Sequence, residues 1–160
     1  MKILGIDIGT RCGWALWSDG LITASGVWEL KPSRFEGPGM KAIKLQRCMS
    51  EVLAGGGVKL VCAEEVRRHM GVDAAHCYGG LLMAIQSHCE AAETPFTTIP
   101  VGTLKHRATG RGNADKDAMI AAAESLLKRH VADDNEADAI WVAVCGAEIY
   151  STLKAKPPNK

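Results

Sequence analysis

The feature that most constrains this chain is its first seventeen residues, MKILGIDIGTRCGWALW, where a single acidic residue lies inside an apolar run. Residues 2–8 are apolar and rich in isoleucine up to Gly9, a pattern that predicts a buried central strand. Strand alternation places Asp7 on the same face as Ile3 and Gly5, and the glycines allow a large group to approach the backbone. A buried carboxylate is costly unless it has a partner or a metal ion, although an aspartate at a strand end can also cap the following turn.

Length and composition predict one soluble domain. The chain has 160 residues, of which 47% are hydrophobic and 23% are charged, and this is enough for one sizeable core. No apolar run is as long as a membrane span, and the N-terminus lacks the pattern of a signal peptide, so we expect a cytoplasmic protein. The six cysteines include no CxxC pair, which predicts reduced core residues. A net charge of +1 neither indicates nor excludes a nucleic-acid partner.

The hydrophobic pattern predicts alternating strands and helices. Residues 11–18 and 21–30, joined by the hairpin signal Asp19-Gly20, should form an antiparallel meander with the first strand. The remaining segments are expected in this order: loop 31–39, helix 40–53, strand 58–66, basic loop 67–71, helix 73–92, strand 95–100, basic glycine-containing loop 101–113, helix 114–130 and a last helix that begins within 133–136.

This order brings two acidic residues together. A right-handed crossover places strand 58–66 parallel to the first strand and beside it. Asp7 and Glu64 then lie at the carboxyl ends of neighbouring strands, where open α/β sheets have their sites. Glu65 points to the opposite face from Glu64, so only one of the two glutamates can join Asp7.

A third acidic residue, Asp138, lies inside the last helix. Asp134 and Asn135 precede it by four and three residues and share its helical face. Oxygen ligands without histidine or cysteine are typical of Mg²⁺ or Mn²⁺ sites, and two such ions can promote phosphodiester cleavage. The alternative is that the acidic residues 133–136 only cap the helix, which accounts poorly for Asp138.

Basic residues concentrate in two segments, one after Glu64 and one within 101–130. Basic side chains beside a metal site would bind phosphates and offset negative charge in the transition state, whereas the alternative is a solvated charged surface. The candidate DNA-binding residues are Arg67, Arg68, Lys105, Arg107, Arg111 and Lys116.

The chain contains four motifs in register: GIDIGTRCGWAL, CAEEV, LK…GRGNADKDAM and NEADAIWVA. Together they resemble RuvC-type Holliday junction resolvases of the RNase H-like superfamily, with phage-encoded members most similar. The resemblance spans nearly the whole chain. It implies an α/β nuclease domain over residues 1–152, with a mixed five-stranded sheet flanked by helices, and a basic disordered tail over residues 153–160. It also implies a homodimeric endonuclease that uses two Mg²⁺ or Mn²⁺ ions per site and nicks four-way DNA junctions in a bacterial or phage-infected cell. No membrane and no small-molecule cofactor are expected.

The same resemblance assigns roles to residues. The catalytic residues are expected to be Asp7, Glu64, Asp138 and Lys116, with Lys105 as a second lysine of the site. The metal ligands are expected to be Asp7, Glu64, Asn135 and Asp138. The chain departs from the family at Asn135, where other members often have an acid or histidine, so Asp134 is an alternative fourth ligand. Some members carry an aromatic wedge at the position of Arg67, and this difference predicts selection by branch shape rather than base sequence.

The sequence also fits other functions. The same metal chemistry would serve a nuclease for RNA or other branched DNA, and a catalytically weak DNA-binding dimer is a further alternative. Actin-like kinases also begin with GIDIGT, but they need a second phosphate loop and a second domain. A junction has two equivalent strands to cut, which favours a two-fold dimer. The pair Gly79-Gly80 predicts a close packing contact, so helix 73–92 is the expected dimer interface.

Overall fold

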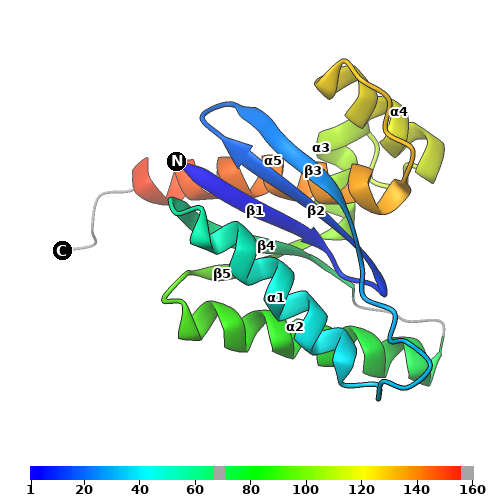
Figure 1. The fold of residues 1–160 in the computed structure, drawn as a ribbon. Helices are drawn as coiled ribbons and strands as arrows, with labels where there is room; N and C mark the ends of the chain where they lie inside the picture. The colour runs from blue at the N-terminus through cyan, green and yellow to red at the C-terminus, as the bar shows by residue number, and fades with distance from the viewer. Residues whose placement is uncertain (67–70, 156–160) are drawn as a thin grey trace.

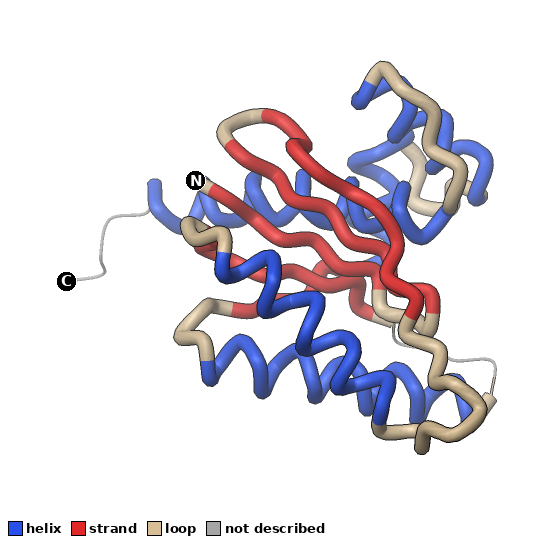
Figure 2. Tube along the Cα trace, viewed as in Figure 1, coloured by secondary structure: helices blue, strands red, loops and turns tan. Residues whose placement is uncertain are grey.

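The computed structural model describes residues 1–66 and 71–155. The chain forms a five-stranded mixed sheet in the order β3-β2-β1-β4-β5, with helices on both faces (Figures 1 and 2). The predicted α/β class with a mixed five-stranded sheet is therefore confirmed. The elements are β1 (Lys2–Asp7), β2 (Arg11–Ser18), β3 (Leu21–Glu29), α1 (Met40–Ala54), β4 (Val58–Glu65), α2 (Val72–Ala91), β5 (Phe96–Pro100), α3 (Val101–Thr109), α4 (Lys116–Leu127) and α5 (Asp134–Ala155).

One segment differs from its prediction. Most of the expected loop 101–113 is the helix α3. Pro100 supplies the extended residue before the helix, fully buried Leu104 anchors it to the core, and Gly110 ends it in the left-handed conformation at φ 76°. The prediction gave too much weight to Gly102, which is tolerated in the first turn. The last helix α5 continues to Ala155, past residue 152, the expected end of the nuclease domain.

The register of the central strands follows from the predicted topology. β1 pairs antiparallel with β2 and parallel with β4. Ile6 lies opposite Ala63 in the parallel pair, so the next residues, Asp7 and Glu64, end up side by side at the carboxyl end of the sheet. The right-handed crossover rule therefore predicted this juxtaposition correctly.

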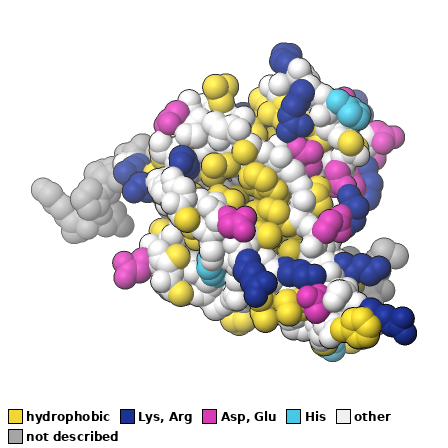
Figure 3. Space-filling view, viewed as in Figure 1, with side chains coloured by type: hydrophobic (Ala, Val, Ile, Leu, Met, Phe, Trp, Pro, Cys, Tyr) yellow, Lys and Arg dark blue, Asp and Glu magenta, His cyan; other side chains and the backbone are white. Residues whose placement is uncertain are grey.

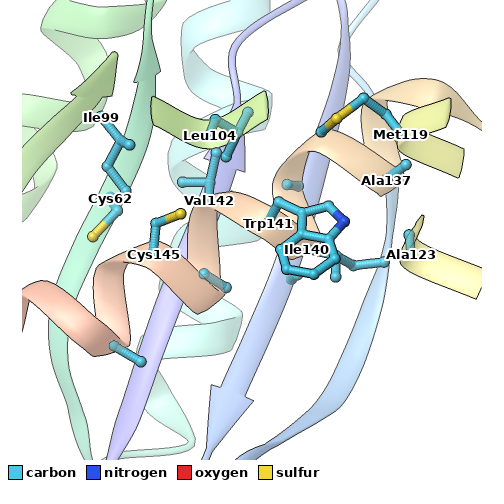
Figure 4. Close-up of a cluster of buried hydrophobic side chains, with 14 of the residues drawn as sticks. Cys62, Ile99, Leu104, Met119, Ala123, Ala137, Ile140, Trp141, Val142 and Cys145 are labelled. Carbon is cyan, nitrogen blue, oxygen red and sulfur yellow. The ribbon is translucent and has the colours of Figure 1, made fainter. Parts of the chain in front are cut away.

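The sheet separates two hydrophobic cores. On one face α1 and α2 cover Leu4, Ile6 and Val61, which strand alternation directs away from Asp7. On the other face α5, flanked by α3 and α4, packs on Ile3 and Cys62. Figure 4 shows this second core, where α5 contributes Ile140, Trp141, Val142 and Cys145. Asp7 shares the face of Ile3, so the acidic site lies on the side of α5.

Three glycines let α5 approach the sheet closely. A methyl group at Gly5 would overlap the backbone of Ala139 and Ala143, and one at Gly146 would overlap the thiol of Cys62. At Gly13 it would overlap the carbonyl of Asn135, in the first turn of α5. The predicted role of Gly5 as a point of close approach is thus confirmed, and the approaching group is a helix of the same chain.

We expect Gly13→Ala to lower the melting temperature by roughly 10 °C, because the clash is with helix backbone, which cannot rotate away. Overpacking of this kind costs about 1–3 kcal/mol or more, and 1 kcal/mol corresponds to roughly 2–4 °C at this size. Scanning calorimetry measures the effect. Gly102→Ala is the matched control, because its methyl would enter open space in a helix. A Gly13→Ala protein that melts like the wild type would contradict the close approach.

No helix in the described ranges is both long and apolar enough to cross a membrane. The six cysteines all lie in these ranges and form no disulfide, as their scattered positions predicted. Four of them, Cys12, Cys62, Cys89 and Cys145, are buried in the cores.

Candidate active site

Three acidic residues from three elements meet on the α5 face of the sheet. Asp7 is the last residue of β1, Glu64 is the next-to-last residue of β4, and Asp138 lies just beyond the first turn of α5. The Asp7 and Glu64 carboxyls hydrogen-bond to each other. Asp138 repels the carboxylate of Asp7, and Glu64 repels that of Asp138. Glu64 is only 9% exposed, unusual for a charged residue. The structure therefore brings the three predicted acids together.

This convergence shifts all three ionisation equilibria toward the protonated form. Burial raises the pKa of Asp7 well above its usual value, and repulsion from Glu64 and Asp138 adds to the shift. Burial also raises the pKa of Glu64, against the hydrogen bond from Asp7 and the positive charge of Lys105. Burial and then repulsion from Glu64 raise the pKa of Asp138 to about 7. Without a cation, the cluster is electrostatically unfavourable.

The donor chemistry of this cluster fits a hard divalent cation. Oδ1 of Asp138 is buried and has no hydrogen-bond partner, which leaves a carboxylate oxygen directed at no protein donor. Carboxylate oxygens are the ligands that Mg²⁺ and Mn²⁺ prefer. In the described part of the chain no three His, Cys, Asp or Glu side chains already form a closed metal-binding group.

The start of α5 carries the two candidates for a fourth ligand. Asp134 pairs with Lys116, and its charge helps to raise the pKa of both Asp7 and Asp138. Asn135 instead donates its side-chain amide to Asp133 Oδ1 at 2.7 Å, and its backbone N–H donates to the same oxygen at 2.8 Å. Each side chain thus retains an oxygen donor for a cation: a carboxylate oxygen in Asp134 and the amide carbonyl oxygen in Asn135.

Two lysines supply positive charge beside the acids. Lys105 of α3 donates to the carbonyl of Ala114 at 2.7 Å, and its charge lowers the pKa of both Glu64 and Asp138. Lys116 is the first residue of α4, and its charge also lowers the pKa of Asp138. The N-terminal end of α4 is fixed by Asp115, which accepts from the Ala118 N–H at 2.9 Å.

The other predicted DNA-binding residues lie elsewhere. Arg107 donates to Glu148 at 2.7 Å and lies over the ring of Trp141, between α3 and α5. Arg107 and Glu148 border two cavities of about 660 and 610 Å³, and neither cavity is lined by Asp7, Glu64 or Asp138. Arg111 is exposed in the loop between α3 and α4. Arg67 and Arg68 lie outside the described residues.

Tyr78 of α2 is a residue of this site that the sequence did not indicate. Its hydroxyl donates to the carbonyl of Glu64 at 2.9 Å and accepts from the N–H of Val66 at 3.2 Å, so it holds the end of β4. Burial raises its pKa, and the charges of Glu64, Glu65 and Asp7 add to the shift. A tyrosine on a largely apolar helix carries no signal of such a role in sequence.

Comparison with known proteins identifies the family. No protein-family model matches the chain. Crossover junction endodeoxyribonuclease RuvC of Anaeromyxobacter sp. (strain Fw109-5) is 30% identical over 150 residues, which cover 91% of this chain and 72% of the relative. The chain belongs to the RuvC family. Nucleases of the RuvC family depend on divalent metal ions, in agreement with the oxygen donors of the acidic cluster.

Solved structures confirm the RuvC fold. Thermus thermophilus RuvC in complex with a Holliday junction substrate superposes with a TM-score of 0.82 at 24% identity, over 98% of this chain and 99% of that one. The yeast mitochondrial Holliday junction resolvase Ydc2 gives a TM-score of 0.68 at 14% identity, over 95% and 80% of the two chains. These similarities establish the RNase H-like fold that the motifs implied.

The acidic cluster of this RuvC-family chain predicts a pH dependence of stability. Because the pKa of Asp138 is about 7 in the folded protein and near 3.9 in an unfolded chain, the folded state binds the extra proton between these values. The metal-free protein should therefore lose a few kcal/mol of stability as pH rises from about 4 through 7, at about 1.4 kcal/mol per unit of pKa shift.

Urea denaturation after metal removal, at pH 5 and pH 8, measures this loss. Asp138→Asn should be more stable than the wild type at pH 8 and should depend less on pH, because it cannot carry the buried charge. Asp117→Asn, at an exposed position in α4, should keep the wild-type pH dependence. Parallel pH profiles for the wild type and Asp138→Asn would contradict the prediction.

Proposed function

We propose that this protein is a divalent-metal-dependent endonuclease that cleaves four-way DNA junctions by phosphodiester hydrolysis. The observation that carries the proposal is the convergence of Asp7, Glu64 and Asp138 on one face of the sheet, with the unpartnered oxygen of Asp138 among them. The relative from Anaeromyxobacter is named for crossover junctions, and the Thermus structure holds a Holliday junction. Both names support a branched DNA substrate.

The proposed roles divide the site into two groups of side chains. Asp7, Glu64 and Asp138 hold Mg²⁺ or Mn²⁺, two ions per site, together with an oxygen from Asp134 or Asn135. When bound, such ions supply an activated water and stabilise the departing oxygen. Lys105 and Lys116 are close enough for their charges to lower the pKa of Asp138, and in this proposal they bind the scissile phosphate and offset its developing negative charge.

Contacts to the rest of the DNA come from basic side chains beyond the acids. Arg111 is exposed near Lys116 in sequence and is the favoured contact to a neighbouring phosphate. Arg107 pairs with Glu148, which offsets part of its charge, and its contact to DNA stays a prediction. The same holds for Arg67 and Arg68. No small-molecule cofactor enters this proposal, and a junction-cleaving enzyme of this kind would act in the cytoplasm, where bacterial or phage DNA is found.

A cleavage assay tests the proposed function. Labelled four-way junction, Y-form and duplex DNA of matched sequence are incubated with the protein and Mg²⁺, Mn²⁺ or EDTA. We expect paired nicks in the junction with either metal, little cleavage of the duplex, and none in EDTA. An RNA hairpin and an RNA–DNA hybrid test the alternative substrates. Cleavage of these with the junction left intact would overturn the proposal, as would binding without cleavage, which the catalytically weak dimer predicts.

A homodimer would supply one site for each strand of the junction, and α2 is the proposed interface. Gly79 and Gly80 are exposed, and a methyl group at either would meet nothing within 4 Å. The packing contact that this glycine pair predicts is therefore absent from the described part of the chain and is available to a second copy. Val72 and Met83, which are 68% and 63% exposed, extend the same helix surface with apolar side chains.

We expect the protein to sediment as a dimer at micromolar concentration. Gly79→Gln should shift it toward the monomer, because the long side chain holds the two α2 helices apart. Ala121→Gln, at an exposed position of α4, is the control for a long polar side chain on a helix outside this surface. Sedimentation velocity measures both variants. A wild-type monomer that still nicks both strands of a junction together would contradict the dimer.

A further inference from the structure

An exposed aromatic ring lies at the tip of a tight turn between β3 and α1. Phe35 is 93% exposed, more than any other large hydrophobic side chain that the structure describes. It is also the one aromatic residue among these exposed side chains in the described ranges. Water contact on nearly the whole of a phenyl ring is unfavourable for a free protein. The ring is therefore available to a partner outside the chain.

The turn does not depend on Phe35 for its structure. Glu36 N–H donates to the carbonyl of Ser33 at 3.1 Å, and Ser33 N–H donates to Glu36 Oε2 at 2.7 Å. Glu36 also pairs with Lys44 of α1 at 3.0 Å, and Lys44 donates to the carbonyl of Lys31 at 2.9 Å. These contacts close the turn and tie it to the helix. The ring is thus presented in a preformed geometry, which lowers the entropy cost of binding.

The turn lies at the same end of the sheet as the acidic cluster. The loop that carries it begins at Leu30, whose N–H donates to the carbonyl of Thr10 at 2.9 Å, and Thr10 is three residues after Asp7. At its other end Pro38 and Gly39 border a cavity of about 330 Å³ together with the first turn of α2, which follows the strand of Glu64. In Figure 1 this loop projects beyond the carboxyl ends of β1 and β4.

The surroundings of the ring are basic. From residue 31 to residue 44 the chain has four basic side chains and a single acidic one, Glu36. Figure 3 shows Lys and Arg side chains gathered over α1 and the loop before it. The Arg34 guanidinium lies 5.9 Å from the centroid of the Phe35 ring. An aromatic ring among cations is the combination that binds an exposed base and its phosphates.

We propose that Phe35 stacks on a base exposed at the branch point of the DNA, while Arg34 contacts an adjacent phosphate. This inference rests on the proposed junction-cleaving function. Bases inside a paired duplex are stacked on both faces, so a ring at a turn tip finds an accessible base face only where the stack is interrupted. Phe35 is accordingly a specificity-determining residue that favours branched over continuous DNA.

The experiment compares binding to a four-way junction and to duplex DNA of the same sequence. Fluorescence anisotropy in EDTA, in an Asp7→Asn background, separates binding from cleavage. Phe35→Ala should lower junction affinity about tenfold and leave duplex affinity unchanged, since stacking contributes about 1–3 kcal/mol per base. Phe35→Trp should retain the affinity, and Phe35→Leu should lose it. Leu21→Ala, which removes a 71% exposed apolar side chain at the hairpin far from Asp7, should have no effect.

Two further readouts separate stacking from charge and from other partners. Arg34→Ala should lower the number of ions released on junction binding, measured from its salt dependence, by about one. Phe35→Ala should leave that number unchanged. A junction with 2-aminopurine at the branch should change fluorescence on binding of the parent protein but not of Phe35→Ala.

Several results would overturn the inference. Wild-type junction affinity in Phe35→Ala, or full affinity in Phe35→Leu, excludes stacking. Weaker dimerisation of Phe35→Ala in sedimentation would assign the ring to a second copy, and loss of binding to anionic vesicles would assign it to a membrane surface. If the parent protein does not prefer the junction to the duplex, the proposed function itself fails. If it does and Phe35→Ala keeps that preference, only this inference fails.

Discussion

Asp7→Asn should abolish divalent-metal-dependent cleavage, by about a thousandfold or more, and leave junction binding in EDTA intact. The carboxylate of Asp7 ends β1 between Glu64 and Asp138, and the amide carries no charge to hold a cation there. The same change should stabilise the metal-free protein, because it removes a buried group that the two other acids repel. Loss of activity with a gain in stability is the pattern expected when a site is built at the expense of the fold.

Initial cleavage rates in Mg²⁺, junction affinity in EDTA and thermal unfolding after metal removal measure these effects. Asp19→Asn is the matched control, since it makes the same chemical change in the β2–β3 hairpin, at the opposite end of the sheet from Asp7. Its cleavage rate should equal that of the wild type. Substantial cleavage by Asp7→Asn would show that the catalytic acids lie elsewhere.

Glu64→Gln should be inactive, while Glu65→Gln should keep cleavage within about threefold of the wild type. The two side chains are adjacent in β4 and point to opposite faces of the sheet. Glu64 hydrogen-bonds to Asp7, and the carboxyl groups of both lie on the α5 face, so this glutamate belongs to the acidic cluster. Glu65 contributes its charge near Tyr78 on the other side. The two variants therefore make the same chemical change at adjacent positions of β4, with opposite expected results.

Thermal unfolding with and without Mn²⁺ provides a second readout that does not depend on DNA. The wild type and Glu65→Gln should be stabilised by Mn²⁺, and Glu64→Gln should gain much less, because it lacks one of the ligands. The reverse order of the two variants, in cleavage or in metal stabilisation, would mean that the register of β4 against β1 differs by one residue.

The sequence by itself determined the centre of the sheet and two of the acids. An apolar strand with one carboxylate, followed by a meander, a helix and a second apolar strand, permits few topologies, because parallel strands are joined by right-handed crossovers. Strand alternation then allows only one of Glu64 and Glu65 to join Asp7, and the family resemblance assigns that place to Glu64. These rules are local and general, so they needed no knowledge of how the helices pack. The mixed sheet, and one glutamate of the second strand beside Asp7, follow from them alone.

Only the tertiary structure decided what surrounds these acids. Asp138 reaches Asp7 because Gly13 lets the start of α5 lie against β2, and no residue pattern states which glycine faces which helix. The side-chain amide of Asn135 is held by Asp133, and the position of Arg107 depends on Glu148, which lies 41 residues away along the chain. Contacts between residues so distant in sequence form only when the helices that carry them are placed to within a few ångströms. Sequence periodicity indicates which face of a helix is buried, but it does not place the helix along the sheet.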